Sequence, residues 1–132
     1  MFDKLIGNNH IKEILKRLVK ARRVPNSLLF AGEDGIGKSL FALELAKSFV
    51  CQNPLDGEAC DKCAACRRSD VFVIPKPDKK EDYEKVFFSE HADVGKVVPF
   101  KNSILVNSIR ALESEANFRP FESNARFFII EE

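Results

Sequence analysis

Two groups of residues in this chain have the types and the spacing that phosphate binding and metal binding require. The first is Gly-Glu-Asp-Gly-Ile-Gly-Lys-Ser at residues 32–39, which fits the pattern of a glycine, four residues and then Gly-Lys-Ser or Gly-Lys-Thr. The glycines let the backbone curl so that successive N–H groups point at one anion, and the positive end of a following helix adds to the attraction. Lys38 can bridge the outer phosphates, and Ser39 can supply a hydroxyl to Mg²⁺. We therefore predict a nucleotide-binding loop.

The patterns on either side of this loop come in the order that phosphate binding requires. Residues 27–31 (SLLFA) form a short apolar run, which predicts a central parallel strand. Residues 39–51 carry apolar positions on one helical face, which predicts a helix that begins near Lys38. A chance glycine-rich turn is the alternative, and this context makes it the weaker interpretation.

The second group contains every cysteine of the chain. The four are Cys51, Cys60, Cys63 and Cys66. Thiolates separated by two residues can face one tetrahedral ion, and the longer loop after the first cysteine can return the fourth ligand. Four sulfurs leave no position for water, so we predict a structural Zn²⁺ that holds a small protrusion in shape. Free buried cysteines, disulfides and an iron–sulfur cluster remain alternatives.

A pair of acids, Glu131 and Glu132, directly follows the apolar strand run FFII. Hydrolysis of a bound nucleotide needs an acid at the end of a neighbouring strand to hold the Mg²⁺ shell, and a second group to orient water. The two acids are candidate catalytic residues on this basis. Two solvated acids without a catalytic role are the alternative.

The rest of the chain predicts one α/β domain with a parallel sheet. Amphipathic helices are expected over residues 9–22 and 103–118, with Pro25 blocking continuation of the first. A hairpin is expected over residues 71–88. The sequence stops on a run typical of a buried strand, and we therefore expect a fragment of a longer protein.

Composition narrows the classes of function. The net charge is +1 with 31% charged residues, which gives no case for a nucleic-acid binder acting through bulk charge. The N-terminus is charged throughout, and no apolar run is long enough to cross a bilayer. We predict a cytoplasmic protein, and in a reducing compartment clustered cysteines favour a metal site over disulfides.

The motifs together resemble those of bacterial DNA polymerase III δ′ subunits, which are part of the sliding-clamp loader of the AAA+ class. The similarity begins with FDKLIGNNHIKEILKRLVKARRVPNSLLFAGEDGIGKS and continues through the cysteines to HADV, SILVNSIRAL, FRPFE and FFIIEE. It covers nearly the whole chain. The resemblance implies a P-loop NTPase fold, with a parallel sheet flanked by helices and an inserted four-cysteine zinc module at about residues 51–66. Residues 1–132 would be the N-terminal part of such an ATPase-like domain, truncated after the second acidic motif.

The resemblance also implies site residues. In this superfamily ATP or ADP with Mg²⁺ is held by the phosphate loop, and the segment before that loop lies against the adenine. The corresponding positions here are Leu5, Ile6, Gly7, Val24, Pro25, Asn26, Gly32, Gly35, Ile36, Gly37, Lys38, Ser39 and Leu40. The second acidic motif corresponds to Glu131 and Glu132, although the family's motif begins with Asp. Residues 67–90 are longer than the usual link, which predicts an insertion of unknown role.

The partners that the resemblance implies are other clamp-loader subunits, the sliding clamp and, through the assembly, primer-template DNA, with no membrane. δ′ subunits often act as a stator, so we expect little or no ATP turnover by this chain alone. The τ/γ-type motor subunit of the same loader shares both motifs and is the nearest alternative. A stand-alone P-loop kinase or ATPase, and a scaffold in which nucleotide does not matter, are further alternatives; scattered arginines disfavour the kinase.

Overall fold

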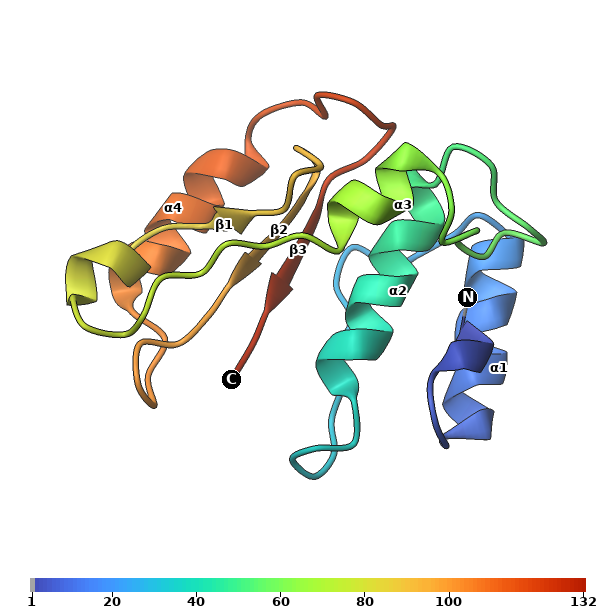
Figure 1. The fold of residues 1–132 in the computed structure, drawn as a ribbon, viewed down its shortest axis with the longest axis horizontal. Helices are drawn as coiled ribbons and strands as arrows, with labels where there is room; N and C mark the ends of the chain where they lie inside the picture. Colours follow the sequence, from blue (N-terminus) through green and yellow to red (C-terminus); the bar gives the residue numbers. More distant parts are fainter. Residues whose placement is uncertain (1) are drawn as a thin grey trace. The chain divides into compact units, whose positions relative to one another are not determined.

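The structure is a computed structural model that describes residues 2–132. It divides into two units, one comprising the residues up to Arg67 and the other Arg68–Glu132 (Figure 1). The phosphate-loop motif and the four cysteines belong to the first unit, and the two acids belong to the second.

The first unit is built around two helices that pack side by side (Figure 1). The short 3-10 helix η1 (Phe2–Lys4) precedes α1 (Asn9–Lys20), and α2 (Lys38–Val50) begins within the phosphate-loop motif at residues 32–39. Their apolar faces meet in a core formed by Phe2, Leu15, Val19, Phe41 and Leu45. A third helix, α3 (Ala64–Ser69), begins within the cysteine segment and contains Cys66.

The helices of this unit agree with the sequence prediction to within a turn. The first helix ends at Lys20, two residues before the predicted end, and Arg22 takes a φ of 54°. This left-handed conformation cannot continue an α-helix. The second helix begins at Lys38 as predicted.

The predicted strand over residues 27–31 is wrong for this structure. These residues form no strand, and Leu29 is 91% exposed. A parallel strand is defined by a ladder of hydrogen bonds to a neighbouring strand. In the described part of the first unit, the only β pairing is an isolated bridge between Leu55 and Glu58. Residues 27–31 therefore have the composition of a buried strand but no partner that would make them one.

The second unit contains a three-stranded sheet in the order β1-β2-β3. A 3-10 helix, η2 (Lys80–Tyr83), leads into β1 (Phe87–Phe88), which pairs antiparallel with β2 (Val94–Val97). The last strand, β3 (Phe127–Ile130), pairs in parallel with β2. The sheet is thus mixed, and only one of its pairings has the predicted parallel direction.

Helix α4 (Val106–Ala116) connects β2 to β3 and packs against β2 (Figure 1). It lies within the helix predicted over residues 103–118. A parallel pair of strands needs such a crossover. Near it, a small core forms from Tyr83, Phe87 and Val98.

The predicted hairpin over residues 71–88 is wrong. Residues 71–76 form no strand, and β1 pairs forward with β2 instead of backward with residues 71–74. Among residues 2–132, no helix has both the length and the apolar character needed to cross a membrane.

Candidate functional site

The phosphate-loop motif joins an irregular segment to the start of α2. Gly35 and Gly37 take φ angles of 83° and 94°, in the left-handed region where a side chain would be strained. Gly37 is the N-cap of α2 and supplies no side chain to cap the helix. The backbone N–H groups of the first turn therefore lie at the positive end of α2, where an anion is favoured.

Lys38 lies at this helix start and folds back over the loop. Its Nζ donates a hydrogen bond of 2.8 Å to the carbonyl oxygen of Gly32. The ammonium is thereby held within the turn that the motif forms, where it can exchange this carbonyl for a phosphate oxygen. Ser39 and Leu40, the next two residues of α2, are exposed, with Leu40 at 58%.

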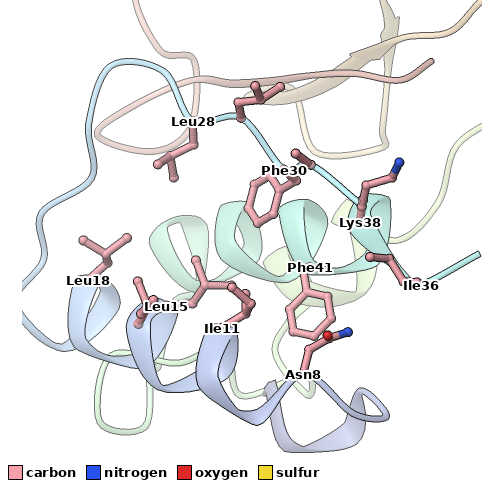
Figure 2. A pocket seen from close by; sticks show the side chains of 12 residues that line it. Asn8, Ile11, Leu15, Leu18, Leu28, Phe30, Ile36, Lys38 and Phe41 are labelled. Atoms are coloured by element: carbon pink, nitrogen blue, oxygen red, sulfur yellow. The ribbon is translucent and has the colours of Figure 1, made fainter. Parts of the chain in front are cut away.

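A cavity of about 370 Å³ lies beside the loop, between α1, residues 28–31 and the start of α2 (Figure 2). Its lining is aliphatic and aromatic apart from Asn8 and Lys38. Of the predicted nucleotide contacts, Ile36 and Lys38 line it. This lining is suited to apolar or flat aromatic groups and has too few donors for a triphosphate.

The predicted adenine contacts differ in their surroundings. Ile6 is 94% exposed and Gly7 has a φ of 76° with open space around its α-carbon. Leu5 and Val24 instead pack against the core of the first unit. Ile6 and Gly7 are accessible to a ligand, whereas Leu5 and Val24 serve the core.

The structure brings the four cysteines together. Their sulfur atoms all lie within 4.8 Å of one another, and the sulfurs of Cys51 and Cys63 are 3.8 Å apart. Zinc–sulfur bonds of about 2.3 Å in a tetrahedron separate the sulfurs by about 3.8 Å. None of the four is in a disulfide. The donor set and its dimensions fit a single tetrahedral ion.

Backbone N–H groups point at these sulfurs. The N–H groups of Lys62 and Cys63 donate to the sulfur of Cys60 at 3.4 and 3.3 Å, and that of Cys66 donates to the sulfur of Cys63 at 3.4 Å. Such bonds stabilise a thiolate, the form that binds metal. Burial raises the pKa of Cys63, but the N–H groups of Cys66 and Gln52 outweigh it and lower this pKa to about 6.

The two remaining ligands behave differently from Cys60 and Cys63. Backbone N–H groups also lower the pKa of Cys60, whereas burial raises the pKa of Cys51 and of Cys66. A bound cation would offset the effect of burial on the pKa values of these two thiols, because a thiol that coordinates a metal ion is deprotonated.

The cysteine segment is tied to the helices of the first unit. Cys51, Cys60 and Cys66 are buried. The buried side chain of Lys47 on α2 reaches Asp61 in the cysteine loop, with 2.8 Å between Nζ and Oδ1. Charged groups flanking the cysteines therefore fasten the segment to the helices of the first unit.

The candidate acids in the second unit are not equivalent. Glu131 is half-buried and pairs with Lys96 of β2, with 3.1 Å between Nζ and Oε1. Its N–H donates to the carbonyl of Val97 at 2.9 Å and extends the β2–β3 ladder. Glu132 is exposed.

Sequence reasoning missed a buried acid, Asp93, which is 1% exposed. Its carboxylate accepts backbone N–H bonds of 2.7 Å from Phe121, Glu122 and Ser123, and these bonds lower its pKa against the effect of burial. The guanidinium of Arg126 lies 3.6 Å away. The signal in the sequence was an aspartate between apolar residues in HADV, a type of residue that is rarely buried without such partners.

Comparisons with known proteins place these features in context. Residues 7–132 match the model of the family described as DNA polymerase III, delta subunit. The chain is 28% identical to the DNA polymerase III subunit gamma/tau of Mycoplasma pneumoniae over 137 residues, which cover 99% of this chain and 16% of that relative.

Two Bacillus subtilis proteins are also similar. The chain is 30% identical to DNA polymerase III subunit delta' over 122 residues, which cover 91% of this chain and 31% of that relative. It is 32% identical to DNA polymerase III subunit tau over 66 residues, covering 50% of this chain and 12% of that protein. The chain thus spans less than a third of the length of each of these relatives.

Proposed function

Because the chain belongs to the DNA polymerase III, delta subunit family, whose model matches residues 7–132, we propose that it is the nucleotide-binding part of a sliding-clamp loader subunit. Its partners would be other loader subunits, the sliding clamp and, through the assembly, primer-template DNA. The support for this role is the family together with similarity to subunits named gamma/tau and delta'.

In this proposal, residues 32–39 hold the phosphates of ATP or ADP with Mg²⁺. The observation that carries it is the left-handed conformation of Gly35 and Gly37 directly before α2. This geometry turns backbone donors toward a phosphate at the positive helix end. Lys38 supplies the cation, and Ser39 supplies a hydroxyl for Mg²⁺. Exposed Ile6 and Gly7 are then available for the base.

The second part of the proposal is a structural Zn²⁺ on Cys51, Cys60, Cys63 and Cys66. The support is the 3.8 Å separation of two of the sulfurs and the mutual distances within 4.8 Å. An iron–sulfur cluster would interpose several iron and sulfide atoms and would hold the thiolates farther apart. Zinc supplies no redox chemistry, so its role is to fix the loop between the first and last cysteine.

We propose that the subunit acts as a nucleotide-binding or stator component and that this chain alone hydrolyses little or no ATP. The ion pair between Glu131 and Lys96 supports this, because an acid already neutralised by lysine is a poorer partner for Mg²⁺. Residues 67–90 are proposed to be an insertion relative to the family, with no assigned role.

A motor subunit is the second candidate. The observation in its favour is the similarity to subunits named gamma/tau, one of which aligns over 99% of this chain. Substantial ATP hydrolysis that depends on Glu131 would favour the motor over the stator.

Calorimetric titration of the protein with ATP or ADP, each with Mg²⁺, tests the central proposal. We expect saturable binding of one nucleotide per chain. Circular dichroism on the same sample establishes that it is folded. A folded protein that gives no binding heat at several temperatures would overturn the proposed nucleotide role.

A further inference from the structure

The N-terminal segment of the first unit, residues 2–7, is tied to the cysteine loop by charged side chains. Lys4 lies 3.2 Å from Asp61 and 2.9 Å from Glu44, measured from Nζ to a carboxylate oxygen in each case. Lys47, which is fully buried, lies 2.8 Å from Asp61 and 3.5 Å from Glu44. Two cations and two acids therefore form one network that joins η1, α2 and the cysteine loop.

A second tie lies at the other side of the loop. The N–H of Phe2, a residue with no exposed surface, donates to Oε1 of Glu58 at 3.0 Å. Gly57 has a φ of 85°, and a β-carbon there would lie 2.4 Å from the carbonyl oxygen of Val19. Arg22 donates to the Gly57 carbonyl at 3.2 Å. The loop is thus seated closely against the end of α1 and against η1.

The position of Asp61 depends on the sulfurs on both sides of it. Cys60 precedes it, Cys63 follows two residues later, and the N–H groups of Lys62 and Cys63 bond to the sulfur of Cys60. A metal on the cysteines would fix this turn, since each sulfur would be held at one vertex of a tetrahedron. Without metal, the loop from residue 52 to 62 has few apolar residues to hold its shape.

The segment that these ties hold runs directly into Ile6 and Gly7. Both residues are exposed, so their own contacts do not fix them. Toward the N-terminus, Leu5 packs against the core and its carbonyl accepts a hydrogen bond from Nζ of Lys12, and Phe2 and Lys4 then make the ties described above. Loosening of Phe2 and Lys4 would leave Leu5 as the remaining hold on the positions at which the base is proposed to bind.

We propose that the metal-bound cysteine loop anchors the N-terminal segment through Asp61, so that the metal state sets nucleotide affinity. This inference rests on the proposed zinc and nucleotide sites. Asp61 acts as a positioning residue, because it touches neither the metal nor the nucleotide. Loss of the metal releases Asp61, then Lys4 and residues 2–7, and nucleotide binding weakens.

The test measures amide hydrogen exchange by NMR on the metal-loaded protein and on the protein stripped of metal by a chelator. The probe is the N–H of Leu5, which donates to the carbonyl of Phe2 at 3.0 Å. Amides of α2, in the same unit as Leu5, are the internal reference for unfolding of that whole unit. We expect exchange at Leu5 to accelerate about tenfold or more on metal removal, without a matching change in α2.

Substitutions separate the anchor from the metal. Asp61→Asn should accelerate exchange at Leu5 while one Zn²⁺ remains bound, and nucleotide affinity should fall severalfold. Lys4→Met cuts the same tie from the exposed end and leaves Lys47 with both acids, so it serves if the first variant folds poorly. Asp56→Asn is the control, because Asp56 lies exposed in the same loop and makes no ion pair within residues 2–132.

The decisive result is non-additivity. If Asp61 transmits the effect, stripping the metal from Asp61→Asn adds little further exchange at Leu5. Additive effects, or normal exchange and affinity in both Asp61→Asn and Lys4→Met, would overturn the anchor while leaving zinc and nucleotide binding intact. A protein that holds no metal would overturn the metal dependence at its premise, and absent nucleotide heat would mark failure of the nucleotide site itself.

Discussion

The ammonium of Lys96 lies 3.1 Å from a carboxylate oxygen of Glu131, joining the middle of β2 to the residue that follows β3. Lys96 is 15% exposed and Glu131 is 26% exposed, so the pair is partly shielded from solvent. The same ammonium lies 4.3 Å from the ring centre of Phe72. A Mg²⁺ ion that used Glu131 would have to compete with a cation that is already held in place.

We expect ATP turnover by the protein to be indistinguishable from the buffer rate. Glu131→Gln should leave this rate unchanged, since the acid is occupied by Lys96. Phosphate release under saturating ATP and Mg²⁺ measures it, with Glu132→Gln as the matched control. Brisk hydrolysis that Glu131→Gln abolishes and Glu132→Gln spares would contradict the stator assignment.

Lys38→Ala should weaken nucleotide binding by about tenfold or more, because the loop loses the cation that neutralises the outer phosphates. Lys20→Ala, at the exposed end of α1, removes the same charge without touching the loop and should bind normally. Calorimetric titration compares the two. Equal affinities would mean that residues 32–39 do not hold the phosphates.

The protein purified without added zinc should carry one Zn²⁺ per chain, measured by elemental analysis. Cys60→Ser should lower that content, because the site then loses one of its thiolates. Free zinc at about 1,000 times its dissociation constant would stabilise the fold by about 4 kcal/mol. A sample that is fully folded and free of metal would argue for ordinary buried thiols.

The local features of the fold were predictable from sequence, and the non-local ones were not. Periodicity located α1, α2 and α4 to within a turn or so, because the apolar face of a helix is written within a few residues. The cysteine cluster was predictable because its ligand spacing is equally local. Strand pairing could not be predicted in this way. β1 pairs with β2 and not with the segment around Val71, although that segment is equally apolar.

The contacts that fix the cysteine loop were not predicted because they join residues far apart in the sequence. Lys47 and Asp61 are fourteen positions apart, and Phe2 and Glu58 are fifty-six apart. No pattern in the sequence links such residues. The clustering of the cysteines could be predicted from their spacing, but the attachment of their loop to the N-terminal segment came only from the folded structure.

The stability of the protein should decrease in two steps as the pH falls. Burial lowers the pKa of His91 below 6.5 in the folded protein. As the pH falls, this histidine therefore takes up a proton more readily in the unfolded chain, and the stability of the fold begins to decrease below about pH 6.5. Hydrogen bonds from Arg68 and from the Ala92 N–H lower the pKa of Glu122 from 4.5 to about 2. Its contribution is present above pH 4.5 and is lost as the pH falls toward 2.

Thermal unfolding between pH 8 and pH 3 measures this dependence. Nδ1 of His91 accepts the N–H of Asp93 at 3.2 Å and lies 3.8 Å from Glu122, so protonation would break the first contact. His91→Asn should flatten the upper step and leave the lower one. His10→Asn, on the exposed surface of α1, should keep both steps. If this variant lost the upper step, the step would come from His10 and not from His91.

Asp93→Asn should lower the free energy of unfolding by about 2–4 kcal/mol, the range for removing one partner of a buried charged network. The amide would present N–H groups to backbone donors at residues 121–123, where the carboxylate now accepts three bonds of 2.7 Å. It would also remove one of the two acids beside Arg126, which is 5% exposed, and leave Glu115 at 3.4 Å. Urea denaturation measures the loss, with Asp78→Asn in an exposed loop as the control. An unchanged midpoint would mean that residues 121–123 are held by other contacts, among them the Arg126 guanidinium that lies 5.1 Å from the ring centre of Phe121.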